Sequence, residues 1–143
     1  MSLCVNFMLL HPDARLPGRL TPGSAGCDLY AVAQQILLVG VVYLIPVGIA
    51  FEIPFGYEGQ IRPRSSMGKR GIIIPNSPGT IDSDYRGEIL VQLMSLSHQE
   101  HIQAGDRIAQ HVIVPVVTDI LFIQSHSLGS TERGSGGCGS TGR

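Results

Sequence analysis

The chain has 143 residues, of which 43% are hydrophobic and 15% charged, and its formal net charge is −1. This length and composition predict one folded domain with a sizeable core and argue against a disordered chain. The near-neutral charge argues against a broad electrostatic grip on nucleic acid, so we expect no stable nucleic-acid binding.

The first third of the chain shows no sign of secretion or membrane insertion. The opening residues MSLCVNFMLL lack the basic region that begins a secretory signal. The longest apolar run, ILLVGVVYLIPVGIAF (36–51), falls short of the roughly 20 residues of a spanning helix, and Gly40 and Pro46 interrupt it. We expect two buried strands around a turn near Gly40 and no membrane contact.

Short runs rich in Val, Ile and Leu recur between Gly, Pro, Asn and Asp. In chain order they are VNFMLL (5–10), VVYLIPVGIAFEI (41–53), GIIIP (71–75), GEILVQLMSL (87–96), RIAQHVIVPVV (107–117) and DILFI (119–123). This spacing predicts an all-β sandwich or barrel. SSMGKRG (65–71) has room for one helical turn. We expect the folded core to cover residues 1–128 and a mobile, glycine-rich arm to cover 129–143.

Cysteine and histidine give no metal or disulfide pattern. The chain has three cysteines and no CxxC pair, which fits a reducing compartment. We therefore expect a cytoplasmic protein, or a nuclear or other intracellular one if the source is eukaryotic or viral. HQEH (98–101) lacks a third ligand, and we interpret it as a solvated loop.

Three polar segments interrupt the β pattern. AGCDLYA (25–31) holds one acid, RPRSSMGKRG (62–71) holds four basic residues among serines, and NSPGTIDSDYRGEI (76–89) is rich in turns and acids. Arginines, hydroxyls and backbone N–H groups suit a phosphate ester. A carboxylate set apart can hold Mg²⁺ through water, and another can act as a general base. Taken singly, such loops are usually just solvated.

Taken in order, these segments resemble the motifs of the trimeric dUTP pyrophosphatase (dUTPase) family. The five motifs read AGCDLYA (25–31), RPRSSMG (62–68), NSPGTIDSDYRGEI (76–89), GDRIAQHVIVP (105–115) and RGSGGCGSTG (133–142). The resemblance implies a distorted jelly-roll or β-barrel subunit in a homotrimer, with a flexible C-terminal arm that closes over the active site. It also implies Mg-assisted hydrolysis of dUTP to dUMP and pyrophosphate by water attack on the α-phosphate. That reaction limits uracil incorporation into DNA and supplies dUMP for dTMP synthesis.

The resemblance also implies residue roles. Asp82 would be the catalytic general base, and Tyr85 would lie under the deoxyribose and exclude a 2′-hydroxyl. Asp28 would bind Mg²⁺ through water, and Arg133 would reach the γ-phosphate. The implied substrate-binding residues are Arg64, Ser65, Ser66, Asn76, Gly79, Asp82, Tyr85, Gln110, Arg133, Gly137 and Cys138, of which Arg64, Ser65, Ser66 and Gln110 would contact the phosphates from a neighbouring subunit.

The chain departs from the family pattern at three positions. Ser66 replaces a usual glycine, Val47 replaces a frequent threonine as a packing change, and Cys138 stands where phenylalanine usually covers the uracil ring. We interpret Asp106 and Arg107 of the fourth motif as a structural pair.

Two alternatives to a dUTPase remain open at this stage. The RSS spelling also resembles the dCTP deaminases, which share the fold and carry a glutamate where this chain has Gln92. The other alternative is a non-catalytic nucleotide-binding protein, against which the retained Asp28, Asp82 and Arg133 argue.

Overall fold

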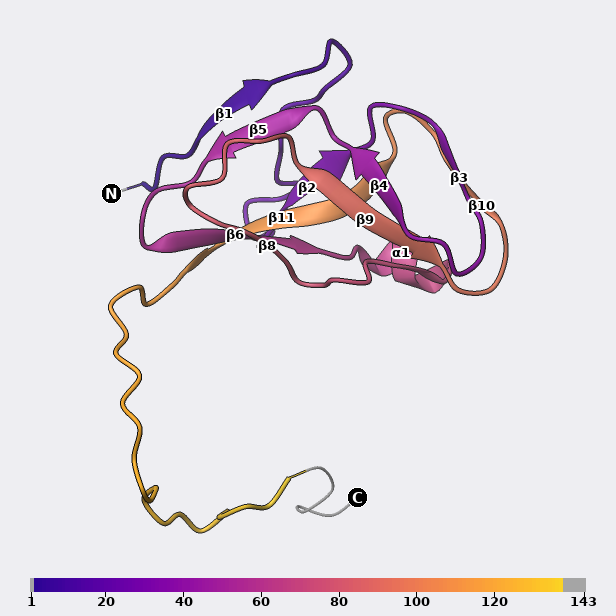
Figure 1. Ribbon diagram of the computed structural model, residues 1–143. Coiled ribbons are helices and arrows are strands. Elements are labelled where there is room, and N and C mark those ends of the chain that lie inside the picture. Colours follow the sequence, from indigo (N-terminus) through magenta and orange to yellow (C-terminus); the bar gives the residue numbers. More distant parts are fainter. Residues whose placement is uncertain (1, 138–143) are drawn as a thin grey trace.

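The computed structural model describes residues 2–137, and β-strands make up nearly all of its regular structure (Figure 1). In chain order the elements are β1 (Asn6–Leu9), β2 (Cys27–Tyr30), β3 (Gln35–Leu37), β4 (Tyr43–Pro46), β5 (Ile49–Glu52), β6 (Tyr57–Arg62), α1 (Ser65–Lys69), β7 (Ile72–Ile73), β8 (Gly79–Ile81), β9 (Leu90–Ser95), β10 (Glu100–Ile102) and β11 (Arg107–Pro115). The predicted all-β class is confirmed, and α1 lies in the segment for which the sequence predicts one helical turn.

Within residues 2–137 the strands form four antiparallel sheets. The largest has the strand order β2-β11-β6-β8, so that β11 pairs with β2 on one side and with β6 on the other. The smaller sheets join β1 to β5, β3 to β10, and both β4 and β7 to β9. These pairings bring distant motifs together, because Asp28 of β2 lies opposite Gln110 of β11.

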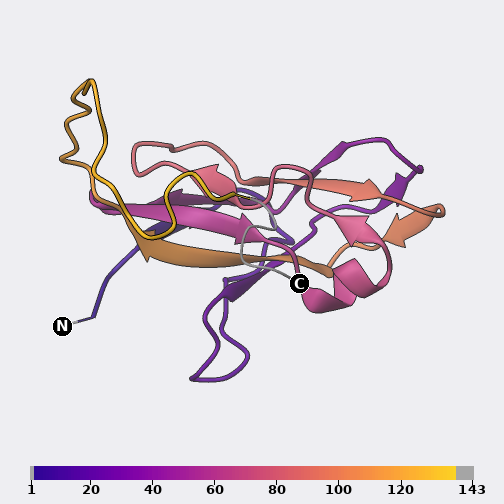
Figure 2. The ribbon, with the colours of Figure 1, turned by 90° about the horizontal axis from the view of Figure 1, so that it is seen from below.

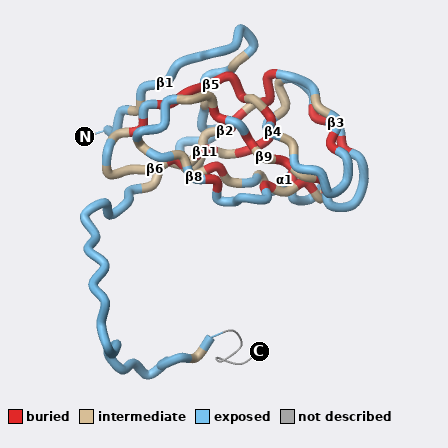
Figure 3. The backbone as a smooth tube through the Cα atoms, viewed as in Figure 1, coloured by how far each residue is buried: buried red, intermediate tan, exposed pale blue. Residues whose placement is uncertain are grey.

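The inward faces of the sheets enclose an apolar core, and Figure 3 draws the buried residues of the chain in red. Strand β9 shows why: Val91 and Leu93 are fully buried while Gln92 between them is partly exposed, as a two-residue period requires. Val47 is 1% exposed, in keeping with a packing role. The largest fully buried apolar side chains are Leu29, Leu37, Ile45, Ile49, Ile72, Ile89, Leu93, Ile102 and Ile108.

The apolar run 36–51 folds differently from the expected pair of buried strands. It contributes to three strands, β3, β4 and β5. Gly40 turns the chain after β3 with a φ of 74°, and Gly48 turns it after β4 with a φ of 68°, a region that favours glycine. One face of the run also points outward, since Ile36 is 47% exposed and Leu44 is 59% exposed.

Two further expectations from the sequence are wrong in part. The run 119–123 forms no strand: β11 ends at Pro115, and Leu121, Phe122 and Ile123 are at least 84% exposed, with no pairing segment in the described part of this single chain. HQEH is not wholly a solvated loop, because Glu100 begins β10 and is only 8% exposed.

No helix within residues 2–137 has the length and apolarity required to cross a membrane.

Candidate functional site

Asp28 of the first motif is buried against two arginines. Arg64 donates from Nε to Asp28 Oδ1 at 3.0 Å, and Arg107 donates from Nη1 to Asp28 Oδ2 at 3.3 Å. Asp28 is 8% exposed, and two charge-assisted hydrogen bonds offset the cost of removing its carboxylate from water. The three side chains therefore form one fixed charged cluster.

Arg64 is held by more than this carboxylate. It precedes α1, and its Nη1 also donates to Ser66 Oγ at 3.3 Å and to the carbonyl oxygen of Arg107 at 3.2 Å. Ser65 and Ser66 are exposed in the first turn of α1. No non-glycine residue in the described range has a positive φ, so Ser66 replaces the usual glycine without backbone strain.

Asp28 and Arg64 border a cavity of about 260 Å³. Its lining consists of Leu20, Ser24, Ala25, Gly26, Asp28, Arg64 and Gln110. A side chain at Gly26 would place its Cβ only 3.1 Å from Gln110 Cβ, so the glycine allows β2 to approach β11 closely. The fold thus brings three predicted site residues, Asp28, Arg64 and Gln110, into one pocket, which we call the Asp28 pocket.

Asp82 and Tyr85 of the third motif lie at a second cavity, of about 240 Å³. Asp82 is exposed directly after β8, and its carbonyl accepts a hydrogen bond from the Tyr85 N–H at 3.1 Å. The Tyr85 hydroxyl donates to the carbonyl oxygen of Glu88 at 2.9 Å. The lining, which we call the Asp82 pocket, is Leu44, Thr80, Ile81, Asp82, Tyr85, Glu88, Ile89, Leu90 and Gln92.

Two glycines shape this side of the molecule. A Cβ on Gly87 would lie 2.4 Å from the Tyr85 hydroxyl oxygen, so only glycine leaves the ring in place. Gly79 of β8 pairs with Ile61 of β6, and a Cβ there would lie 3.1 Å from the Asn76 side-chain nitrogen. Asn76 and Gly79 therefore adjoin each other just before Asp82.

The two pockets lie apart along the largest sheet. Asp82 follows β8, where Ile81 pairs with Gly59 of β6, whereas Arg64 lies beyond the far end of β6, about 17 Å from Gly59 along the strand direction. The two linings share no residue. A single chain therefore does not bring Asp82 to Arg64.

The segment after Pro115 leaves the barrel at the end opposite α1, as both ribbon views show (Figures 1 and 2). Arg133 is exposed there, and its Nε donates to the carbonyl oxygen of Gly136 at 3.0 Å. Arg133 lines neither pocket. Gly137 is exposed and is the last residue described, and Cys138 lies outside the described residues.

Arg107 is a site residue that sequence reasoning missed. The prediction that Arg107 forms a structural pair with Asp106 is wrong. Asp106 Oδ2 accepts a hydrogen bond from the Gln103 N–H at 2.9 Å, and Arg107 donates to Asp28 instead. Neighbouring residues of an extended strand project to opposite faces, so Asp106 and Arg107 point apart. The sequence feature that could have indicated this role is that Arg107 lies in the same motif as Gln110.

His111 follows Gln110 on β11 but is turned into the barrel. It is 5% exposed, its ring stacks on Phe51 with centroids 4.4 Å apart, and its Nε2 has no hydrogen-bond partner among the residues that the structure describes. Burial lowers the pKa of His111 to about 4. The imidazole is therefore neutral near pH 7 and belongs to the core, not to the Asp28 pocket.

The donor groups fit a hydrated magnesium ion better than a protein-built metal cage. No three His, Cys, Asp or Glu side chains are grouped to hold a metal anywhere in residues 2–137. Asp28 is the sole acid in the lining of its pocket. Mg²⁺ keeps several waters and commonly binds one or two carboxylates together with substrate phosphates, which matches a pocket with a single acid.

The fold and the two pockets define a small β-barrel protein built to bind a phosphate ester. The chain belongs to the dUTPase family, whose model matches residues 13–142. The deoxyuridine 5'-triphosphate nucleotidohydrolase of Nautilia profundicola is 50% identical over 136 residues, which cover 94% of this chain and 95% of the relative. The predicted family and enzyme class are therefore confirmed.

Solved structures show the same fold. The Staphylococcus bacteriophage 80alpha dUTPase with dUPNHPP matches with a TM-score of 0.89 at 27% identity, over 99% of this chain and 100% of that one. A mutant dUTPase of phage phi11 of S. aureus, in which a structural Mg(II) ion is coordinated, matches with a TM-score of 0.79 over 90% of this chain and 100% of that one. At 24% identity this second match shows the fold alone.

Proposed function

We propose that this chain hydrolyses dUTP to dUMP and pyrophosphate. The observation that carries the proposal is the shared pocket of Asp82 and Tyr85, which sets an exposed carboxylate beside an aromatic ring. Such a pair suits a sugar packed on the ring and a water activated by the acid. The 50% identity to a deoxyuridine 5'-triphosphate nucleotidohydrolase and the likeness to a dUTPase with dUPNHPP support the same substrate.

The Asp28 pocket is the proposed phosphate site. Arg64 is a planar double donor fixed in orientation by Asp28 and Ser66, and a fixed guanidinium binds phosphate oxygens without losing further side-chain freedom. The exposed hydroxyls of Ser65 and Ser66 and the amide of Gln110 supply further donors. Asp28 would hold the waters of a Mg²⁺ ion bound to the triphosphate, which neutralises phosphate charge.

The Asp82 pocket is the proposed nucleoside and reaction site. The Asp82 carboxylate accepts the proton of the attacking water. The Tyr85 ring, fixed through its hydroxyl to Glu88, lies under the deoxyribose and leaves no room for a 2′-hydroxyl. The turn that contains Asn76 and Gly79 would read the uracil edge.

The complete site would form between chains of a homotrimer. In one chain the two pockets share no described lining residue, and Arg64 and Asp82 lie at opposite ends of the paired strands β6 and β8. Phosphates and nucleoside are therefore held together if neighbouring chains supply one pocket each. Leu44, Leu90 and Phe122 expose 59%, 43% and 95% of their surface, which favours burial against other chains. The arm would then bring Arg133, Gly137 and Cys138 to a site away from its own barrel.

A product assay tests this function. Pure protein with Mg²⁺ is incubated separately with dUTP, dCTP, dTTP and UTP, and the products are identified. We expect dUMP and pyrophosphate from dUTP alone. Ammonia from dCTP would instead identify a deaminase, although Gln92, which lines the Asp82 pocket, is an amide and cannot act as a base. Binding without turnover would identify a nucleotide-binding protein.

A further inference from the structure

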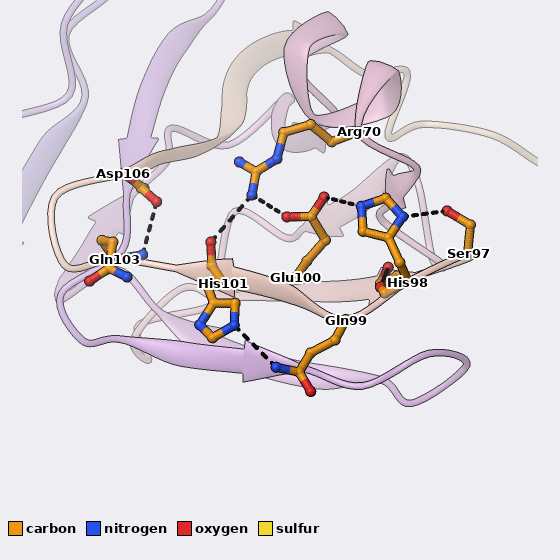
Figure 4. A network of polar contacts seen from close by, with 9 residues as sticks. Arg70, Ser97, His98, Gln99, Glu100, His101, Gln103 and Asp106 are labelled. Atoms are coloured by element: carbon orange, nitrogen blue, oxygen red, sulfur yellow. Dashed lines mark hydrogen bonds and ion pairs between the residues drawn. The ribbon is translucent and has the colours of Figure 1, made fainter.

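Glu100 occupies a position where a core residue is expected. In β10, Glu100 and Ile102 are buried while His101 between them is exposed. The Glu100 side chain is only 10% exposed, and its carboxylate forms an ion pair with the guanidinium of Arg70. Figure 4 shows this carboxylate between Arg70 and His98.

Both carboxylate oxygens of Glu100 are engaged. Arg70 Nη2 contacts Oε2 and also donates to the carbonyl oxygen of His101 at 3.3 Å, while His98 Nε2 lies 2.9 Å from Oε1. The Arg70 hydrogen bond lowers the pKa of Glu100 below its usual value and outweighs the opposing effect of burial. These contacts give the Arg70 guanidinium a defined position, although 42% of the Arg70 side chain is exposed.

Stability alone does not account for such a pair. The Glu100 carboxylate is only 10% exposed, so its removal from water costs energy, while the Arg70 side chain is 42% exposed and its attraction is weakened by solvent. A buried carboxylate that is paired with one guanidinium does, however, fix one arrangement of the elements that the pair joins. Here these elements are β10 and the end of α1, because Arg70 directly follows Lys69, the last residue of α1.

α1 is a short rigid connection between Arg70 and the proposed phosphate site. The helix has five residues, so Arg64 before it and Arg70 after it lie about 9 Å apart along its axis. Met67 in its middle is 4% exposed and packs in the core. A rotation of α1 about Met67 that moved Arg70 would therefore also move Arg64 and the serines of the first turn.

We propose that the Arg70–Glu100 ion pair is a positioning pair that sets the orientation of α1 and, through it, of Ser65, Ser66 and the main chain of Arg64, whose guanidinium Asp28 holds, toward the triphosphate. This inference rests on the proposed phosphate role of Arg64. Neither Arg70 nor Glu100 lines either pocket, so both would act through the helix that carries the phosphate-binding residues.

Ligand binding by calorimetry separates positioning from simple stabilisation. Glu100→Gln keeps the shape of the side chain and removes its charge. We expect its affinity for dUPNHPP to fall about tenfold, as for one misplaced charged contact, and its affinity for dUMP to stay within about twofold. Arg70→Gln should behave alike, and the double variant should be no weaker than the weaker single variant, because both remove the same contact.

Three further variants make the test decisive. Arg70→Lys retains the positive charge, so it should bind dUPNHPP more tightly than Arg70→Gln and nearly as tightly as the unaltered protein. This comparison tests the pair even if Glu100→Gln folds poorly. Glu52→Gln breaks the half-exposed Arg86–Glu52 pair, 3.7 Å apart, and should change neither affinity. Arg64→Gln should weaken dUPNHPP binding directly.

Equal loss of dUPNHPP and dUMP affinity in Glu100→Gln, or a lower melting temperature with unchanged affinities, would overturn the positioning role. If Arg64→Gln weakens dUPNHPP binding while Glu100→Gln does not, the positioning inference alone fails. If Arg64→Gln leaves that binding intact, the phosphate role proposed above fails as well.

Discussion

The Asp28 pocket and the Asp82 pocket differ in how their polar side chains are held. Asp28 is 8% exposed and bonded to two guanidinium groups, one of which is fixed further by Ser66. Asp82 is exposed on a turn, and Tyr85 beside it is 42% exposed and bonded to a backbone carbonyl. Buried charged contacts preorganise the first pocket, whereas the second leaves its carboxylate open to water.

This difference matches the proposed division of the site into a phosphate-binding pocket and a reaction pocket. Donors that are oriented before the ligand arrives bind phosphate oxygens with little reorganisation. A carboxylate that is exposed and free to approach a water suits proton transfer. Changes in the Asp28 pocket should therefore affect both stability and binding, and changes at Asp82 should affect mainly turnover.

The largest expected effect is that of Asp82→Asn on turnover. The amide keeps the shape but cannot accept the proton, so kcat should fall about 10²-fold or more. The melting temperature should change little, because the carboxylate is exposed. Asp28→Asn is the contrasting variant: it leaves Arg64 and Arg107 without their counter-charge and should lower the melting temperature. Pyrophosphate release and thermal unfolding of both variants measure the contrast, and near-normal turnover of Asp82→Asn would assign the base to another residue.

The next effect concerns the stability of the folded chain in acid, which depends on His111 of β11. An unfolded chain protonates histidine below about pH 6.5, but the folded barrel keeps His111 neutral down to about pH 4. The unfolded state therefore binds more protons in this window, and the free energy of unfolding should fall by about 2 kcal/mol from pH 7 to pH 5.

His111→Met removes this titration with a flexible side chain that suits a core. Denaturant unfolding of this variant should show a much smaller loss between pH 7 and pH 5. His126→Gln, at an exposed histidine, is the matched control and should keep the full loss. An unchanged pH dependence in His111→Met would show that another group causes the acid sensitivity.

A smaller effect is expected from Gly87→Ala. The new Cβ would lie 2.4 Å from the Tyr85 hydroxyl oxygen and 2.6 Å from its Cζ, so the ring must leave its bond to Glu88. The preference for dUTP over UTP, measured as a ratio of kcat/KM values, should fall about tenfold, the scale of a lost steric contact. Gly18→Ala, where no atom lies within 4 Å of the new Cβ, should keep the preference. A preserved ratio in Gly87→Ala would remove Tyr85 from sugar discrimination.

The sequence predicts those features that depend on local pattern. Alternating apolar residues predict β9, the run rich in Val and Ile predicts β11, and SSMGKRG predicts the single helical turn of α1. The run 119–123 has the same apolar character but forms no strand, because a strand also requires a partner, and the described part of one chain offers none.

Contacts between distant residues are harder to predict from sequence. The pairing of Asp28 with Arg107 depends on the register of β2 against β11 and on the β-bulge between Arg107 and Ala109. The burial of Glu100 depends on Arg70, which lies 30 residues away in the chain. The local composition around these residues predicts neither contact.

The central claim is that the Asp28 pocket of one chain and the Asp82 pocket of another form one active site. Arg64→Gln and Asp82→Asn chains are each expected to be nearly inactive, and the test is the dUTPase activity of trimers refolded from an equal mixture of the two. An Asp82→Asn chain supplies an intact phosphate pocket and an Arg64→Gln chain an intact Asp82, so about a quarter of the neighbouring pairs should form an unaltered site and restore about a quarter of the normal activity. Activity no higher than that of the two variants measured separately would contradict a site shared between chains.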